Sequence, residues 1–389
     1  MIPRDPAPSG LDAVGLDLLG IDPVVAPGGA RADLAVAVRV AHEDSTAHVG
    51  GRLRHREERE AEAAARLAPG ATRPVGAGRR AVPEEPDPFR LCFERDLDRV
   101  KHSRPWRRLA GKCQVFVAPD DDHLRTRLTH AVEVAQVATG IARVAGLCLP
   151  LTEAIALAHD CGHGPAGHAS EEAFAPYLPG GYDHAVYGAD VTLAPLNLCV
   201  ETLDGVRNHS WRRPAPATPE GEVVAWADRI AYVCHDFEDA VRAGILTPAD
   251  LPAEIAQVVG RERSRQIEVF VLAVLEAIAA TGAVGMVEPQ AAALAGFRAF
   301  NFERIYLRPA SLEQAARAIG LLRGLVDHFV DVPARLPEGS TGARLGLEPG
   351  SAEAAAVAVR YVSGMTDRYA LGLGVRLLGW RPDELPRGV

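Results

Sequence analysis

The feature that most constrains this chain is a helical spacing of apolar residues that runs from about Phe89 almost to the C-terminus. In residues 127–145 the apolar side chains recur mostly three or four positions apart, which places them on one face of a helix. Gly146 follows as a favourable C-terminal residue for that helix. The same spacing predicts further helices over about residues 152–160, 219–243, 264–280, 311–330 and 351–371.

Signals for β-structure are almost absent from the sequence. No segment of useful length alternates apolar and polar residues, and only residues 113–119 (CQVFVAP) are compatible with a short β-hairpin. Ser311 and Gln314 form a capping-box pattern, which predicts that the helix running to about Val330 begins there. We therefore expect an all-α fold built as a single large helical domain.

The N-terminal residues differ in composition from the expected helical domain. Residues 1–55 are rich in Ala, Gly, Pro and Asp, and we expect an extension of uncertain order. Residues 56–88 combine a charged helix with an arm whose Pro and Gly content argues against a regular element. The helix is a plausible assembly element, although a helix exposed to solvent is the simpler interpretation. The main domain is expected over residues 89–385, with a Gly/Pro-rich loop at 337–350.

The composition narrows the class of protein. A hydrophobic fraction of 48% is ample for a packed core, and a formal net charge of −9 argues against broad coating of duplex DNA. No apolar stretch approaches the ~20 residues of a membrane span, and the first residues are not typical of a secretory signal. The six cysteines show no CxxC spacing, which argues against zinc ligation by cysteine and predicts reduced thiols in a cytoplasmic protein.

The residues best suited to chemistry cluster in the segment HDCGHGPAGH, which begins at His159. An adjacent His159 and Asp160 at the end of a helix can both turn toward one cation. Their nitrogen and oxygen donors suit Mn, Fe, Ni, Zn or Mg. The three glycines that follow allow a tight bend, which would return His163 and His168 toward the same place.

Two more ligands are predicted on other helices. His130 lies near the start of the 127–145 helix, and Asp228 lies in the middle of the apolar 219–243 helix. A buried carboxylate at such a position is costly unless it is paired or bound to a metal. Together with the His–Asp pair, these residues would supply four ligands from three helices and leave positions open for water and substrate.

Each of these residues also has a simpler explanation. A single histidine on a helix is usually a core residue, and Asp228 could form a surface salt bridge with its neighbour Arg229. His–Asp pairs also arise by chance, as the pair at 235–236 illustrates. The combination favours a metal site, because a histidine precedes the pair, a glycine-bent segment follows it, and an aspartate lies on a later helix.

This combination resembles the HD-domain phosphohydrolases, and more closely the deoxynucleoside triphosphate triphosphohydrolase family of the dGTPase type. The resemblance extends from about Arg56 to Trp380. It rests on an ordered series of blocks: FERDLDRVKHSRPWRRLAGKCQVF (93–116), RLTHAVEVAQVATGIA (127–142), HDCGHGPAGHASEEAF (159–174), GGYDHAVYGADV (180–191), LDGVRNHSW (203–211), WADRIAYVCHDFEDAVRAG (226–244), FNFERIYLRP (300–309) and YVSGMTDRYAL (361–371). The resemblance implies a metal-dependent hydrolase that cleaves dNTPs, with dGTP as one candidate, at the α-phosphate to a deoxynucleoside and tripolyphosphate.

The resemblance also implies roles for individual residues. One divalent ion per site (Mn, Mg, Fe, Ni or Co) would be held by His130, His159, Asp160 and Asp228. The residues matched to the catalytic set are His163, His168, Glu171 and His184. Among these, His168 oriented by Glu171 is the preferred general acid or in-line catalytic group. The substrate-binding set is Arg127 and Tyr232 at the α-phosphate and sugar, Asp236 near the ribose, and Gln114 at the sugar 3′ side.

The resemblance implies a homo-oligomer, hexameric or tetrameric, with dNTP or single-stranded DNA as possible regulators and no membrane partner. The chain contains only two lysines, so arginines would have to grip the outer phosphates, and the candidates are Arg207, Arg304 and Arg308. Two alternatives stay open. One is an HD phosphohydrolase for another nucleotide, such as a nucleoside monophosphate or a modified nucleotide, and the other is a nucleotide-binding regulator with little turnover.

Overall fold

The computed structural model describes residues 39–117, 121–337 and 346–388. Contacts between residues divide the chain into two units, Met1–Arg52 and Leu53–Val389. The described part of the first unit, residues 39–52, contains bends and turns with exposed side chains and no helix or strand. Most of the extension predicted for residues 1–55 lies outside the described residues.

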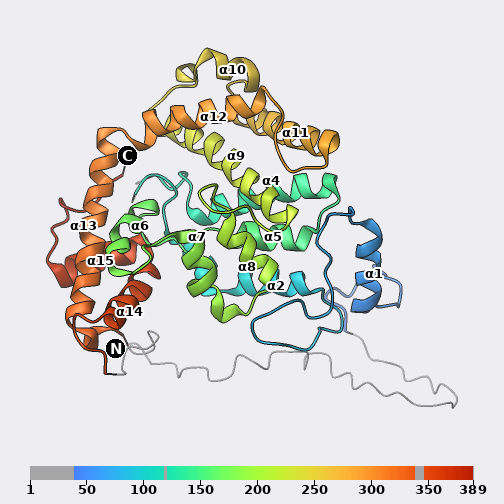
Figure 1. Cartoon of the computed structure of the whole chain (residues 1–389), viewed down its shortest axis with the longest axis horizontal. Helices are drawn as coiled ribbons and strands as arrows, with labels where there is room; N and C mark the ends of the chain where they lie inside the picture. Colours follow the sequence, from blue (N-terminus) through green and yellow to red (C-terminus); the bar gives the residue numbers. More distant parts are fainter. Residues whose placement is uncertain (1–38, 118–120, 338–345, 389) are drawn as a thin grey trace. The chain divides into compact units, whose positions relative to one another are not determined.

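The unit Leu53–Val389 is built from α-helices joined by short turns, several of them 3₁₀ or π turns (Figure 1). The helices are α1 Arg56–Arg66, α2 Cys92–His102, α3 Arg104–Arg108, α4 Arg127–Ala145, α5 Leu149–Ala158, α6 His168–Phe174, α7 His184–Tyr187, α8 Val200–Asn208, α9 Pro219–Arg242, α10 Ala253–Val259, α11 Arg263–Thr281, α12 Gln290–Asn301, α13 Pro309–Asp331, α14 Ala352–Ser363 and α15 Asp367–Leu378. The described residues contain no strand, so the predicted all-α class is confirmed.

Helix α4 shows how the sequence sets the bounds of an element. Thr126 has extended backbone angles, and its hydroxyl accepts a hydrogen bond from Thr129 N at 3.3 Å, which caps the first turn. At the other end Gly146 adopts a left-handed conformation with φ 70°, a conformation that glycine accepts at little cost. The observed bounds Arg127–Ala145 confirm the predicted range 127–145.

Two predictions about where helices begin and end were wrong. The capping box at Ser311 and Gln314 does not form, because α13 begins at Pro309 and the Ser311 hydroxyl instead donates to Ile305 O at 2.8 Å. The single late helix predicted over 351–371 is two helices, because the first of them, α14, ends at Ser363. Thr366 then caps α15 by accepting from Tyr369 N at 3.4 Å.

The hairpin predicted at residues 113–119 is also absent from the described residues. Cys113 forms a single isolated antiparallel bridge with Thr126, and no second strand follows. Residues 118 and 119 of the predicted hairpin lie outside the described part of the chain. One bridge is enough to hold the segment beside the start of α4, where Arg127 N donates to Lys112 O at 2.9 Å.

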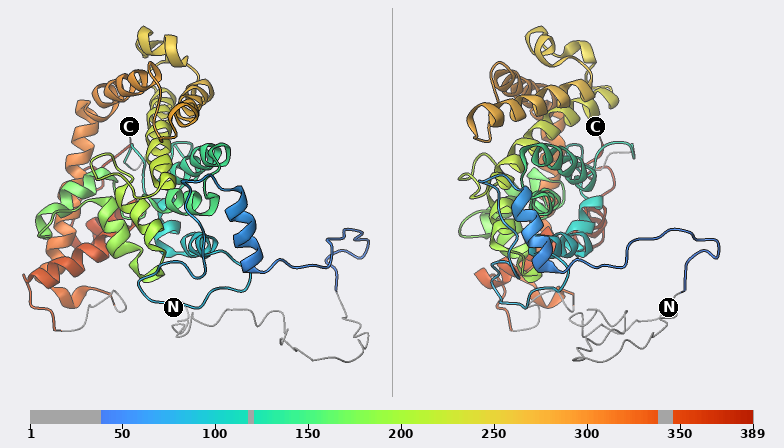
Figure 2. Two further views of the ribbon diagram at one scale, coloured as in Figure 1. Left: turned by 45° about the vertical axis from the view of Figure 1, so that its right-hand side comes forward. Right: turned by 90° about the vertical axis from the view of Figure 1, so that its right-hand side faces the viewer.

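Two large hydrophobic clusters hold together the helices whose arrangement is drawn in Figure 2, and they place the site. The first cluster packs α2, α4, α5, α8 and α9 together, with α11 and α12 against α9. The second cluster joins α6 to α13, α14 and α15. The loop between α5 and α6 passes from the first cluster to the second, and this loop carries the glycine-rich histidine segment.

The irregular arm after α1 is fastened to the helical core by buried carboxylates. Glu220 is fully buried and accepts hydrogen bonds from Thr72 N, Thr72 Oγ1 and Cys148 N at 2.7–3.0 Å. Asp96 is also fully buried and accepts from Arg80 Nη1 at 2.6 Å. The six cysteines are buried and form no disulfide, as expected for reduced thiols. No described helix is long and apolar enough to cross a membrane.

Candidate functional site

Three helices bring the four predicted metal ligands together. His130 lies in the first turn of α4, His159 and Asp160 directly follow α5, and Asp228 lies in the middle of α9. His130 Nε2 lies 3.0 Å from Asp228 Oδ1. His159 Nε2 lies 3.4 Å from Asp160 Oδ1 and 3.7 Å from Asp228 Oδ1. Residues almost a hundred positions apart in the chain thus face one point.

The free nitrogen of His159 fits a cation. Nδ1 of this ring lies 2.7 Å from Ala156 O, which can only accept, so Nδ1 carries the proton. In the neutral imidazole the lone pair is then on Nε2, which faces the carboxylates of Asp160 and Asp228 and has no hydrogen-bond partner among the described residues. His159 thus belongs to two groups of possible ligands, one with His130 and Asp228 and one with Asp160 and His209. Their imidazole and carboxylate donors form the mixed set that divalent transition metals accept.

The charges within this group favour anionic carboxylates. Burial alone would lower the pKa of His130, but the Asp228 carboxylate raises it above its ordinary value. Burial would raise the pKa of Asp228, yet the hydrogen bond to His130 holds it below its usual range. For Asp160 the effect of burial is outweighed by His159 and by Arg127, whose Nη1 donates to Oδ2 at 2.7 Å, and its pKa is far below normal. Both carboxylates are therefore available to a cation.

The simpler explanations do not describe this geometry. Asp228 is hydrogen-bonded inside the group and forms no ion pair with Arg229 in the described structure. The other His–Asp pair of the chain is divided between two environments. His235 Nδ1 lies 3.2 Å from Glu133 Oε2, whereas Asp236 faces the cavity described below.

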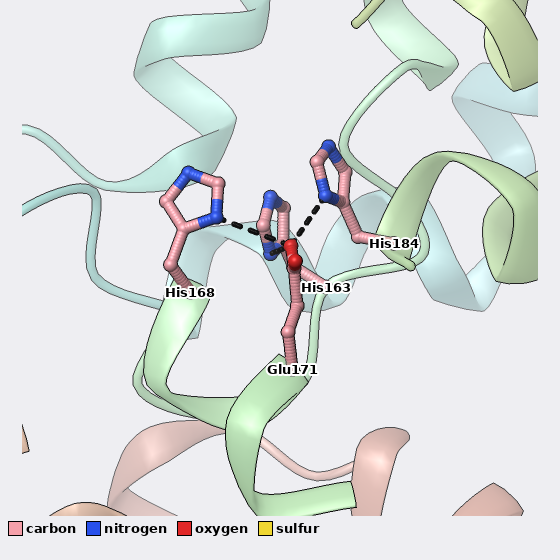
Figure 3. A group of neighbouring side chains, drawn as sticks. All are labelled: His163, His168, Glu171 and His184. Carbon is pink, nitrogen blue, oxygen red and sulfur yellow. Dashed lines mark hydrogen bonds and ion pairs between the residues drawn. The ribbon is translucent and has the colours of Figure 1, made fainter. Parts of the chain in front are cut away.

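A second group of side chains lies beside the first (Figure 3). It consists of His163 from the loop after α5, His168 and Glu171 from α6, and His184 from α7. Glu171 Oε1 lies 2.6 Å from His184 Nδ1, 3.1 Å from His168 Nδ1 and 3.8 Å from His163 Nδ1. The predicted pairing of His168 with Glu171 is present, and the same carboxylate oxygen also orients His184.

Burial and neighbouring charges shift the pKa values within this second group in different directions. Burial would lower the pKa of His184, but the Glu171 carboxylate raises it above its ordinary value. Burial and the nearby Arg127 charge lower the pKa of His163 far below its usual range. Burial opposes ionisation of Glu171, but its hydrogen bonds to His168 and His184 hold its pKa well below normal. Near neutral pH the group therefore contains an anionic carboxylate and a neutral His163.

One cavity of about 560 Å³ unites the predicted residues. Eleven of the twelve line it: Gln114, Arg127, His130, Asp160, His163, His168, Glu171, His184, Asp228, Tyr232 and Asp236. The remaining residue, His159, lies behind the wall with its side chain fully buried. The cavity thus holds the possible metal ligands, the histidines around Glu171 and the predicted substrate-binding residues in one space.

The predicted substrate-binding residues have partners that the sequence did not indicate. Tyr232 Oη accepts a hydrogen bond from Arg298 Nε at 2.9 Å. Asp236 Oδ2 accepts from Tyr306 Oη at 2.5 Å, and burial raises the pKa of Asp236 to about 7. Gln114 Oε1 is buried and has no hydrogen-bond partner among the described residues, so it is available to a ligand in the cavity.

Among the lining residues that sequence reasoning did not assign to the site are His209, Arg229, Arg298 and Tyr306. His209 directly follows α8, and its Nε2 lies 3.2 Å from His184 Nε2. Burial, with His159 and His184 nearby, lowers the pKa of His209 to about 4. His209 lies within a block that carries the resemblance, but its spacing from the HD pair gives no local sign of convergence.

The arginines of the cavity also differ from those expected. The Arg229 guanidinium lies 3.4 Å from the centre of the Trp211 ring. The sequence indicated Arg229 only as a possible salt-bridge partner of Asp228. Of the three candidates for gripping phosphate, only Arg308 lines the cavity. Arg207 instead forms a two-pronged ion pair with Asp190 away from it.

Comparison with known proteins gives a consistent result. The HD domain family model matches residues 127–233, and the phosphohydrolase-associated domain model matches residues 284–375. The chain is similar to deoxyguanosinetriphosphate triphosphohydrolase-like proteins from Caldanaerobacter subterraneus (39% identity, covering 78% of this chain and 90% of the relative) and Clostridium tetani (36%, 78% and 90%). A third relative of the same description, from Ruegeria, is 36% identical over 80% of this chain and 98% of its own length. The chain therefore belongs to the deoxyguanosinetriphosphate triphosphohydrolase-like family of HD-domain phosphohydrolases.

Proposed function

We propose that this protein is a metal-dependent triphosphohydrolase that cleaves dNTPs at the α-phosphate, giving a deoxynucleoside and tripolyphosphate. The observation that carries the proposal is the single cavity in which the group around His159 adjoins the histidines linked by Glu171. The description of the relatives as deoxyguanosinetriphosphate triphosphohydrolase-like supports the same substrate class.

The cavity wall suits a highly anionic substrate. Arg229 and Arg298 line it, and neither forms an ion pair with a carboxylate of the described residues. Each guanidinium lies over an aromatic ring, Arg229 over Trp211 at 3.4 Å and Arg298 over Phe302 at 4.2 Å from the ring centre. A guanidinium without a carboxylate partner can donate two hydrogen bonds to the oxygens of one phosphate group. These two side chains would therefore neutralise and orient the triphosphate.

The residues around the predicted metal can assist attack at phosphorus. A divalent ion held by His130, His159, Asp160 and Asp228 would polarise the α-phosphate and lower the pKa of a water molecule. Arg127 donates to Asp160 Oδ2, which fixes the carboxylate and leaves Oδ1 directed at the site.

A proton donor is needed for the departing 5′-oxygen of the sugar. His168 is the proposed donor, because Glu171 accepts from its Nδ1 at 3.1 Å and so leaves Nε2 to deliver a proton. General acid catalysis of this kind contributes about 10²–10⁴ in rate. His184 contacts the same Glu171 oxygen from the opposite side and would help to balance the negative charge of this carboxylate.

The sugar is proposed to bind at the part of the cavity formed by Gln114, Asp236 and Tyr306. Asp236 and Tyr306 are joined by a 2.5 Å hydrogen bond, and the Gln114 amide oxygen has no hydrogen-bond partner within the described part of the chain. These polar groups suit the 3′-hydroxyl of a deoxyribose. A homo-oligomer and a separate regulatory site for dNTP or single-stranded DNA remain predictions, which light scattering with and without each ligand would test.

The test is product identification. Purified protein is incubated with Mn²⁺ and each dNTP in turn, and the anions released are separated by ion chromatography. We expect tripolyphosphate and deoxynucleoside in equal amounts, with the reaction lost in Asp228→Asn and retained in the surface control Asp383→Asn. Release of pyrophosphate or monophosphate alone would contradict the proposal. Turnover confined to another nucleotide, or binding without turnover, would favour the alternatives of a different HD phosphohydrolase or a regulator.

A further inference from the structure

A second cavity, of about 490 Å³, lies apart from the one that holds the possible metal ligands. The two cavities share no lining residue. Residues of α3, of α7 and the turn after it, of α14 and of the start of α15 line the second cavity. A cavity of this volume can take a small ligand, and the chemistry of its lining decides which ligand it suits.

The lining of the second cavity carries positive charge and no negative charge. Its charged residues are Arg108 and Arg360, and no aspartate or glutamate of the described residues lines it. Neither guanidinium forms an ion pair or a hydrogen bond within the described part of the chain, and Nε of Arg108 is buried there without a partner. A partly buried arginine without an anion beside it is unusual, so the pair indicates a place for one.

Arg108 is held against the backbone of the turn between α14 and α15. A Cβ atom at Gly364 would come within 3.2 Å of Arg108 Nη1, so the glycine lets the guanidinium approach the turn closely. Burial lowers the pKa of Arg108, and the neighbouring charge of Arg104 adds to this effect. An anion would offset this cost, because a guanidinium donates paired hydrogen bonds to the oxygens of a phosphate group.

Hydroxyl groups supply further hydrogen-bond donors. Tyr361 Oη and Tyr369 Oη lie 3.1 Å apart, so one hydroxyl donates to the other and the second keeps its proton for another acceptor. Both residues line the cavity, as do Tyr187 and Thr192. Guanidiniums and hydroxyls without a competing carboxylate suit an oxyanion and do not suit a metal cation.

The second cavity lies behind the histidine-rich loop. Cys161 lines it and directly follows Asp160, whose side chain lines the first cavity. Ser363 also lines it, and its carbonyl oxygen accepts a hydrogen bond from Lys112 Nζ at 3.0 Å. The same ammonium group donates to His163 O. A ligand in the second cavity would therefore contact residues that support the loop from behind.

We propose that Arg108 and Arg360 bind a phosphate group in the second cavity, either as inorganic phosphate or as part of a polyphosphate chain. The absence of an acidic residue from the described lining and the buried Nε of Arg108 carry this proposal. The proposal concerns anion binding alone and does not depend on the substrate proposed above.

The test measures how fast phenylglyoxal modifies individual arginines of the full-length protein, with peptides quantified by mass spectrometry. Inorganic phosphate and tripolyphosphate are added separately at constant ionic strength. At ten times the dissociation constant, the bound anion should slow modification of Arg360 roughly tenfold. Arg265, exposed on α11, should react at an unchanged rate. The anion that protects at the lower concentration identifies the source of the phosphate group.

Arg108→Gln tests whether both arginines hold the same anion. This variant should lose most of the protection of Arg360, whereas the control Arg265→Gln should retain it. If circular dichroism shows that Arg108→Gln is unfolded, Gly364→Ala gives the same comparison, because the added Cβ would crowd Arg108 Nη1. Modification of Arg360 that neither anion slows, or protection that survives in the folded variant, would overturn the proposal.

Discussion

At the scale of single residues, Glu171 is the group on which the proposed proton transfer depends. One of its oxygens contacts the imidazoles of His168 and His184 at 3.1 and 2.6 Å, so the orientation of both rings follows from one carboxylate. The His168 side chain is 73% exposed, whereas that of His184 is 9% exposed. The exposed ring is the one free to meet a substrate and exchange protons with solvent.

We predict that His168→Ala lowers kcat about 10²–10⁴-fold while substrate binding is retained, because the variant loses a proton donor and no phosphate ligand. Steady-state kinetics and equilibrium binding of a non-hydrolysable dNTP measure the two effects separately. His102→Ala serves as the control at an exposed histidine. An unimpaired His168→Ala enzyme would remove this residue from the mechanism.

Arg229→Gln is predicted to raise KM for a dNTP by roughly tenfold or more, because a charge-assisted contact to phosphate contributes about 1.5–3 kcal/mol. The matched control is Arg207→Gln, since Arg207 is paired with Asp190 outside the cavity. Binding of the product deoxynucleoside, which has no phosphate, should change little. Equal weakening of nucleoside and triphosphate binding would show that Arg229 supports the cavity without gripping phosphate.

Asp236 predicts a pH dependence of stability. Burial raises its pKa in the folded state to about 7, above the ordinary 3.8, so the folded protein holds this proton over a range in which the unfolded chain has lost it. Its contribution to stability is therefore largest below about pH 4 and is lost as pH rises toward 7, by roughly 2–4 kcal/mol. Asp236→Asn should lack this loss, and Tm measured against pH should converge with wild type at low pH. Parallel Tm profiles would contradict the assignment.

At the scale of elements, the C-terminal helix α15 holds the glycine-bent loop in place. Asp367, at its first turn, accepts from Ala166 N at 2.9 Å and from Cys113 N at 2.8 Å. Ala166 has φ 59°, a left-handed conformation that is unfavourable for any residue with a side chain. Buried Lys112 donates to His163 O and to Ser363 O, and burial lowers its pKa to about 7. The loop conformation is therefore imposed by residues distant in sequence.

Asp367→Asn is predicted to cost about 1–3 kcal/mol in stability, because one of two buried backbone N–H groups loses its acceptor. The same change should lower kcat, since Ala166 lies between His163 and His168 in the loop. Chemical denaturation and steady-state kinetics measure the two effects, with Asp383→Asn as the surface control. A variant with wild-type stability and kcat would show that the loop holds its own conformation.

The elements that the sequence predicted well are those with local signals. The range of helix α4 was predicted from its apolar spacing and from Gly146 at its end, and the cap at Thr126 was not used. The break between α14 and α15 was missed, since apolar spacing continues across Gly364 while the stop depends on Thr366 capping a new helix. The same reason applies to Ser311, whose hydroxyl finds a tertiary partner in place of a helix cap.

At the scale of the whole molecule, the site exists because two hydrophobic clusters are joined by one loop. The predicted ligands could be proposed from residue type and order, but their distances depend on how α4, α5 and α9 pack. His209 could not be recognised in advance, because its approach to His184 follows from the ends of α7 and α8 meeting. That Arg229 and Arg298 have no carboxylate partner among the described residues is likewise a property of the packed cavity.

The most direct test of the central claim is the position of isotope from labelled water. Hydrolysis of a dNTP in H₂¹⁸O with Mn²⁺ is followed by mass spectrometry of both products. Attack at the α-phosphorus predicts one ¹⁸O in the tripolyphosphate and none in the deoxynucleoside. Label in the deoxynucleoside, or release of a nucleoside monophosphate with pyrophosphate, would contradict cleavage between the α-phosphorus and the 5′-oxygen.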